Sequence, residues 1–310
     1  MRHQGLDQPL SEELPCGPDL EESGDWDYAN FMLLAGGQLP TRFFTIDTDG
    51  SGREVPFDKS SIDLDAQLQT IDGFLARSRD VRLLTLEARF QVLSGQIVGF
   101  CEALEAIATV VESQWDHFHP LPFEGEYILR QNTIEGLEDQ VQVILPLLHA
   151  PLAASGSAAI TCRQYMVASG KAKARPDEQT MPLDAIASAL ASERNREQAI
   201  AIHGAVERGL AALDRIRSTF ATKAGPENTP NFDRLRATLS EIRQVIATHR
   251  SELAPAATGT RVSLSTDAVE PAPAGGTVAA PIGRIASHRV ADQALGMGEG
   301  YFLARAPSAP

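Results

Sequence analysis

The chain has 310 residues, with 27 Lys and Arg against 41 Asp and Glu, so its formal net charge at pH 7 is −14. This acidic balance argues against a nucleic-acid-binding protein, because phosphate binding needs a basic face. Apolar residues make up 43%, enough for a hydrophobic core, and the aromatic content of only 6% favours helices over sheets.

Residues 1–60 are rich in glycine and proline. Glycine favours turns and proline lacks a backbone N–H, so long regular elements are not expected in this part of the chain. Short amphipathic pieces such as residues 28–34 have the spacing of a helix. We expect an irregular N-terminal extension that wraps a helical body.

Four helices are predicted next, because apolar residues recur at three- and four-residue steps. They cover residues 63–79, 80–93, 96–115 and 127–145. Ser61 or Asp63 suits the start of the first helix, where the side chain can accept backbone N–H groups. Pro120 ends the third helix, and Pro146 kinks or ends the fourth.

Residues 150–181 are rich in Ala, Ser and Gly, and a short β-like run at 159–162 fits a small hairpin or an irregular crossover. Helical spacing then predicts helices over residues 183–194, 195–223 and 231–252. The elements together predict an all-α fold, an antiparallel helical bundle or array. We assign residues 1–252 to one helical domain, with a core at 60–150 and a second helical set at 182–252.

Residues 253–281 are rich in proline, alanine and glycine and have few large apolar residues, so we expect a flexible linker. Residues 282–310 contain a short helical pattern that is too small to fold alone. We expect this segment to begin a second, incomplete region.

The cysteines Cys16, Cys101 and Cys162 lie far apart and none forms a C-x-x-C pair, so neither a disulfide framework nor a zinc site is expected. The N-terminus lacks the basic and apolar regions of a signal peptide. No apolar run reaches the length of about 18 residues that a membrane-spanning helix needs. We expect a cytoplasmic protein with no membrane insertion.

Residues 116–119 are the only dense cluster of possible metal ligands. Asp116, His117 and His119 could serve a metal-dependent enzyme, but histidines also suit the C-terminal end of a helix by their charge. The sequence has no phosphate-binding loop, no H-E-x-x-H and no G-x-S-x-G. We therefore expect no catalytic residue, no bound metal and no cofactor.

Trp26 lies between acidic residues, with Asp25 and Asp27 beside it and Tyr28 next. Tryptophan is enriched at the centres of protein interfaces, so these four residues are a candidate partner-binding site. The alternative is that Trp26 pins the N-terminal segment onto the helical body.

The order of several short motifs resembles a known family. Residues 15–20 read PCGPDL, residues 78–82 read SRDVR, residues 93–95 read LSG, and residues 114–120 read QWDHFHP. This order resembles the ImpA amino-terminal domain of the TssA proteins of type VI secretion. Residues 10–150 carry it most closely, and residues 150–250 share the general helical layout. Residues 283–310 are similar to the family's next motif, with Ala306 in place of its glutamate.

The resemblance implies that the motif residues build the fold rather than a reaction site. This structural motif comprises Arg79, Asp80, Arg82, Trp115, Asp116, His119 and Pro120. We expect Trp115 to fill the core and Asp80 to cap a helix start. We also expect Arg79 or Arg82 to pair with a carboxylate across the bundle.

The resemblance also implies a function, a non-enzymatic assembly or scaffold component of a type VI secretion system. Its implied partners are baseplate, sheath or tube, and membrane-complex proteins, and self-association is a further option. Two alternatives stay open at this point, a metal-dependent enzyme around residues 116–119 and an accessory regulator of the same machine.

Overall fold

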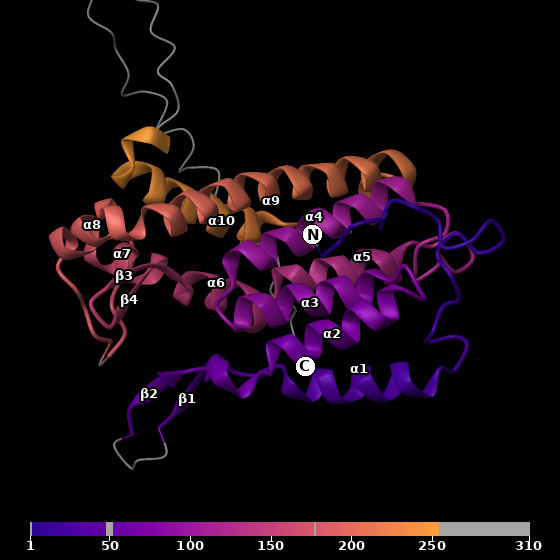
Figure 1. Ribbon diagram of the computed structural model, residues 1–310, viewed down its shortest axis with the longest axis horizontal. Helices are drawn as coiled ribbons and strands as arrows, with labels where there is room; N and C mark the ends of the chain where they lie inside the picture. Colours follow the sequence, from indigo (N-terminus) through magenta and orange to yellow (C-terminus); the bar gives the residue numbers. More distant parts are fainter. Residues whose placement is uncertain (1, 48–51, 177, 254–310) are drawn as a thin grey trace, which may run out of the picture. The chain divides into compact units, whose positions relative to one another are not determined.

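The computed structural model describes residues 2–47, 52–176 and 178–253 (Figure 1). The described residues are predominantly helical. Their α-helices are α1 Trp26–Gln38, α2 Leu64–Leu75, α3 Val81–Leu93, α4 Ile97–Ser113, α5 Ile128–Glu135, α6 Leu145–His149, α7 Cys162–Ala168, α8 Leu183–Ala191, α9 Arg196–Lys223 and α10 Asp233–His249. The predicted linker, apart from its first residue, and the predicted region at 282–310 lie outside the described residues.

The expectation of an all-α fold is only approximately right, because two small antiparallel sheets are present. In one, β1 Phe44–Ile46 pairs with β2 Glu54–Pro56, and in the other β3 Pro151–Ser155 pairs with β4 Ala158–Thr161. The second hairpin falls where the short β-like run predicted one. The first lies in the part expected to be irregular, since three-residue strands are too short to show an alternating pattern.

The sequence predicts α2, α3 and α4 well, but α2 ends at Leu75 rather than at residue 79. Asp63 caps its start, accepting the backbone N–H of Ala66. Past its end, the N–H of Ser78 still bonds to the Phe74 carbonyl, whereas that of Arg79 bonds to the carbonyl of Cys16. A long-range contact therefore fixes the chain four residues past the end of α2.

The predicted single helix over 127–145 is wrong, because the chain breaks at Asp139. Here the backbone is extended, with φ −61° and ψ 125°, and the carboxylate accepts the N–H groups of Val141 and Gln142. Aspartate competes with the helix in this way, which favours caps over helix interiors. The break divides α5 from α6, and Pro146 lies in the first turn of α6, where its missing N–H is harmless.

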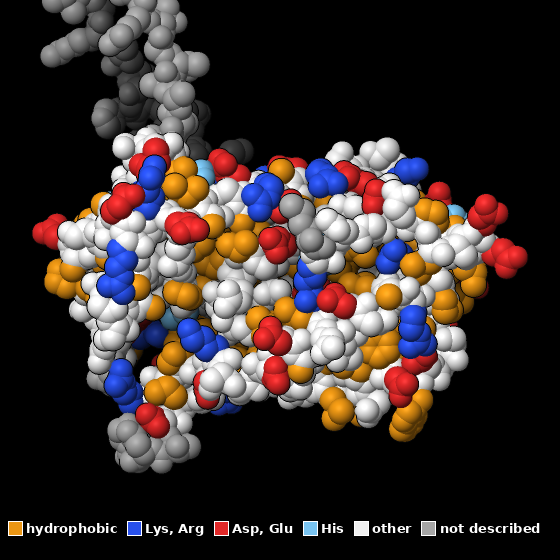
Figure 2. Space-filling model, in the orientation of Figure 1, with side chains coloured by type: hydrophobic (Ala, Val, Ile, Leu, Met, Phe, Trp, Pro, Cys, Tyr) orange, Lys and Arg blue, Asp and Glu red, His pale blue; other side chains and the backbone are white. Residues whose placement is uncertain are grey.

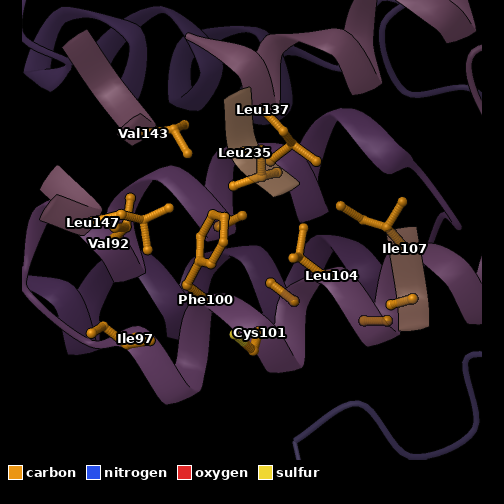
Figure 3. Close-up of a cluster of buried hydrophobic side chains, with 14 of the residues drawn as sticks. Val92, Ile97, Phe100, Cys101, Leu104, Ile107, Leu137, Val143, Leu147 and Leu235 are labelled. Carbon is orange, nitrogen blue, oxygen red and sulfur yellow. The ribbon is translucent and has the colours of Figure 1, made fainter. Parts of the chain in front are cut away.

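The core is one continuous cluster of buried apolar side chains, drawn from α1 through α10. Figure 3 shows Phe100 and Leu104 of α4 pointing toward Leu137 and Leu235. On the other side of α4, Gly209 lets α9 approach closely, since a Cβ there would lie 3.1 Å from the sulfur of Cys101.

Figure 1 places α1 at one edge of this helical body, beside α2, while α4 and α9 lie together on the far side of α3. Phe74 of α2 packs against the rings of Tyr28 and Phe31 on α1, with centroids 5.6 and 5.5 Å away. In the described part of the chain, no helix combines the length and the apolar character needed to cross a membrane.

Candidate functional site

Three segments that are far apart in sequence meet near the start of α1, and we call this meeting point the motif junction. It comprises residues 15–20, 78–82 and 114–120. The N–H of Val81 donates to the His119 carbonyl at 3.0 Å, and the N–H of His119 donates to the Arg79 carbonyl at 3.0 Å. These backbone bonds hold the start of α3 against the segment that follows α4.

The N-terminal segment joins the junction through Gly17 and its neighbours. The hydroxyl of Ser78 donates to the Pro18 carbonyl at 2.8 Å. Gly17 has a φ of +70°, and a Cβ on it would lie 2.0 Å from the carbonyl oxygen of Arg77. Both its left-handed backbone and this close approach require glycine.

Asp80 is the buried acid at the centre of the junction. It caps α3 as expected, accepting the N–H of Arg82 at 2.8 Å, and it also accepts the Tyr28 hydroxyl at 2.9 Å. Its side chain is fully buried. Burial raises the pKa of this carboxyl, although the hydrogen bonds from Arg82 and Tyr28 oppose the rise.

Arg82 is the arginine that pairs with carboxylates across the bundle. Its guanidinium contacts Asp80 at 2.8 Å and Asp19 at 2.6 Å, and it also pairs with Glu21. Arg79 instead donates to backbone carbonyls, including that of Leu75 at 2.6 Å. The expectation that one of the two arginines pairs with an acid is therefore confirmed for Arg82.

His119 lies buried against the N-terminal turn, with its Nε2 atom 2.9 Å from the Gly17 carbonyl and its Nδ1 atom 3.4 Å from Asp19. Burial alone would lower the pKa of His119, but the hydrogen bonds and the charge of Asp19 raise it overall. For Asp19, burial alone would raise the pKa, but His119 and Arg82 hold it below its usual range. The two side chains thus favour a charged pair.

Trp115 fills the core at the end of α4, as expected, and packs against Phe220 of α9 with ring centroids 4.9 Å apart. Beside it lies Arg130, a fully buried arginine that sequence reasoning missed. It donates to the carbonyls of Trp115, Phe118 and Pro120 at 2.5–2.7 Å, all in the segment that follows α4. Burial lowers the pKa of Arg130 to about 10.

The structure does not bring the proposed metal ligands together. Asp116 and His117 are exposed, whereas His119 and Pro120 are buried in the motif junction. Within the described residues, no group of three or more His, Cys, Asp or Glu side chains could hold a metal ion.

The four residues of the candidate partner site divide between surface and interior. Trp26 is 79% exposed and Asp27 is exposed, whereas Tyr28 is buried and bonds to Asp80. Asp25 caps α1, accepting the N–H of Tyr28 at 2.9 Å, and pairs with Arg77. Trp26 therefore does not pin the N-terminal segment onto the helical body.

The outward face of α1 is unusually apolar for a surface helix. Trp26, Asn30, Leu33 and Leu34 follow helical spacing, and Leu33 and Leu34 are 75% and 60% exposed. We call these four residues the α1 surface. Figure 2 shows large hydrophobic side chains protruding along the edge where α1 lies. Surface helices normally turn charged residues outward, so an apolar patch of this kind sets α1 apart from an ordinary surface helix.

Comparisons with known proteins agree with the motifs. Residues 8–139 match the family model described as ImpA, N-terminal, type VI secretion system, which confirms the resemblance over that range and includes both α1 and the motif junction. No match was found among curated proteins.

Among solved structures, the chain is similar to the N-terminal domain including the conserved ImpA_N region of the TssA component of the type VI secretion system from Burkholderia cenocepacia. The TM-score is 0.59 and the identity is 19%, and the match covers 81% of this chain and 94% of that chain. This likeness shows that the two share a fold.

Proposed function

We propose that the protein is a non-enzymatic assembly component of a type VI secretion system that acts in the cytoplasm by binding other proteins of the machine. Its partners are drawn from the baseplate, the sheath or tube, and the membrane complex. The family match over residues 8–139 supports the choice of machine. The geometry supports a non-enzymatic role, because the charged side chains of the motif junction bind one another and are not left free to act on a substrate.

The observation that carries this proposal is the α1 surface. Asp80, Arg82 and His119 are each held by intramolecular contacts, so they serve the fold. Trp26, in contrast, is 79% exposed. An exposed tryptophan beside exposed leucines has the composition of an interface centre.

Co-purification with baseplate, sheath and membrane-complex proteins of the same secretion system tests the proposal. We expect Trp26→Ala and Leu34→Ser to weaken binding of at least one of them by roughly tenfold or more, because interface centres depend on a few large side chains. Ile46→Ser is the matched control, since Ile46 on β1 is also 60% exposed but lies away from α1. Equal binding by all three variants and the unchanged protein would refute the α1 surface as the interface.

A further inference from the structure

A groove of about 240 Å³ lies between α1, α3 and α5. Its apolar lining comes from Met32 of α1, from Leu39 directly after that helix, and from Leu86 of α3. Its polar lining includes Thr85 and Arg89, two side chains of α3 that lie about one turn apart and therefore face the same side of the helix. The motif junction and the match to known proteins leave this groove without a role.

Thr85 is 2% exposed, yet its hydroxyl has no hydrogen-bond partner among the described residues. A threonine inside a helix ordinarily donates to the carbonyl four residues earlier. Thr109 and Thr133 of this chain do so at 2.9 and 2.7 Å. The hydroxyl of Thr85 is therefore a buried polar group that lines a cavity and is left unused by the fold.

Arg89 is the second unused donor. Its Nε atom is buried without a partner, and within the described part of the chain its guanidinium makes neither a hydrogen bond nor an ion pair. Burial lowers the pKa of Arg89, and only the more distant charge of Asp139 opposes this. The Asp139 carboxylate already accepts two backbone N–H groups. Arg82, two turns earlier on α3, shows the contrast, because it pairs with three carboxylates.

Two unpartnered donors in one groove define the chemistry of a missing acceptor. A carboxylate fits best, because it accepts several hydrogen bonds and carries the charge that a guanidinium attracts. Buried polar groups in native proteins are nearly always bonded, so a pair that lines an open groove is placed to bind a ligand.

Exposed leucines on the two helices that flank the groove favour a protein segment over a small acid. Leu33, 75% exposed, follows Met32 on α1, and Leu129, 52% exposed, lies one turn before the groove-lining residues of α5. We propose that the groove binds an Asp or Glu side chain of a partner protein, with neighbouring apolar side chains of that segment covering the exposed leucines of α1 and α5. The inference rests on the proposed function, because it assigns the chemistry of a partner.

Selection of random 12-residue peptides displayed on phage, with the full chain as target, tests this inference. We expect the selected peptides to share an acidic residue beside apolar ones. For a synthetic peptide from the selection, replacing that Glu with Gln should weaken binding about tenfold or more, because the charge-assisted hydrogen bonds to Arg89 would be lost.

Variants of the chain locate the site. Arg89→Met and Thr85→Val keep much of each side chain's volume and should weaken the acidic peptide by about tenfold and several-fold respectively. Arg208→Met is the control, since Arg208 is an exposed arginine of α9. Circular dichroism and thermal melting of each variant show whether the fold is kept.

Three results of the peptide experiments would overturn the inference. These are peptides selected without an acidic residue, peptides that bind Arg89→Met as tightly as the unchanged chain, and competition by acetate as effective as by the peptide. Self-association that occupies the groove, seen as dimers lost in Arg89→Met, would also overturn it. In one combination, Trp26→Ala loses its secretion-system partners while Arg89→Met binds the acidic peptide as tightly as the unchanged chain. That combination would refute the groove but leave the proposed function standing.

Discussion

Arg82 of α3 and Asp19 of the N-terminal segment, 63 residues apart in the chain, meet in a guanidinium–carboxylate contact of 2.6 Å. Their side chains are only 15% and 6% exposed. The same guanidinium also holds Asp80, the N-cap of α3. One arginine therefore links the cap of a core helix to the segment that leads into α1, and so helps to position the α1 surface.

Arg82→Met is expected to destabilise the protein strongly. It would leave the buried carboxylates of Asp19 and Asp80 without their main counter-charge, and breaking a buried ion pair from one side costs about 3–5 kcal/mol. Urea unfolding measures the loss. Arg208→Met is the control, because its pair with Glu105 is half exposed and should contribute less than about 1 kcal/mol. Equal losses in the two variants would contradict this account of Arg82.

His119 should make stability depend on pH. Its pKa is raised in the folded state, so the stability it contributes is fully present below its ordinary value of 6.5 and is lost as the pH rises through the raised folded value. His149 and His249, whose pKa values burial lowers, act in the opposite direction. The contribution of His119 is therefore measured as the difference in unfolding free energy between the unchanged protein and a variant that lacks this histidine.

We expect the free energy of unfolding of the unchanged protein, relative to His119→Gln, to fall between pH 6 and pH 8. Urea unfolding at both pH values measures the difference. A difference that is constant or grows with pH would argue against a charged pair between His119 and Asp19.

Arg130→Lys is expected to recover little of the stability lost in Arg130→Met. The planar guanidinium reaches three carbonyls in the segment that follows α4, whereas an ammonium group is a compact charge on a flexible stem. Leaving buried carbonyls unpaired costs about 1–3 kcal/mol each, so we expect both variants to lose about 3 kcal/mol or more. Chemical denaturation checks this, and a near-normal Arg130→Lys would show that charge alone suffices.

The sequence predicts features that depend on neighbouring residues, and it misses features that depend on contacts between distant segments. Asp80 could be recognised as a cap because capping depends on its immediate neighbours. Arg130 could not be recognised as buried, because a lone arginine in a helical pattern resembles a surface residue until the carbonyls that surround it are known. Asp139 likewise breaks a helix whose apolar spacing continues past it.

The candidate site divides in the same way. The apolar character of α1 and its exposed Trp26 follow from neighbouring residues, so they could be proposed from sequence. The groove could not be predicted, because only the packing of α1, α3 and α5 shows that Thr85 Oγ1 and Arg89 Nε have no hydrogen-bond partner among the described residues.

Gly17→Ala should destabilise the protein more than Gly5→Ala. Both glycines have positive φ, +70° and +78°, so each alanine should cost about 1–2 kcal/mol in backbone strain. Only at Gly17 would the new Cβ also meet a backbone oxygen, at 2.0 Å, since Gly5 has open space around it. Thermal melting of the two variants compares them, and equal shifts would contradict the close approach at Gly17.

Arg89→Met and Thr85→Val are expected to stabilise the isolated protein, unlike the other substitutions. Removing a buried donor that has no partner relieves its desolvation cost, which is about 1–3 kcal/mol for such a group. The midpoint of urea unfolding should therefore rise for both variants. Thr109→Val is the matched control and should not gain stability, because its hydroxyl donates to the Glu105 carbonyl.

Stabilisation by the two groove variants, combined with weaker binding of an acidic partner segment, would separate function from folding at these positions. Residues kept at a cost to stability are typical of binding sites, since the ligand supplies what the fold leaves unpaired. If Arg89→Met instead lowers stability by as much as Arg82→Met does, then Arg89 serves the fold, and the groove loses the donor on which carboxylate recognition depends.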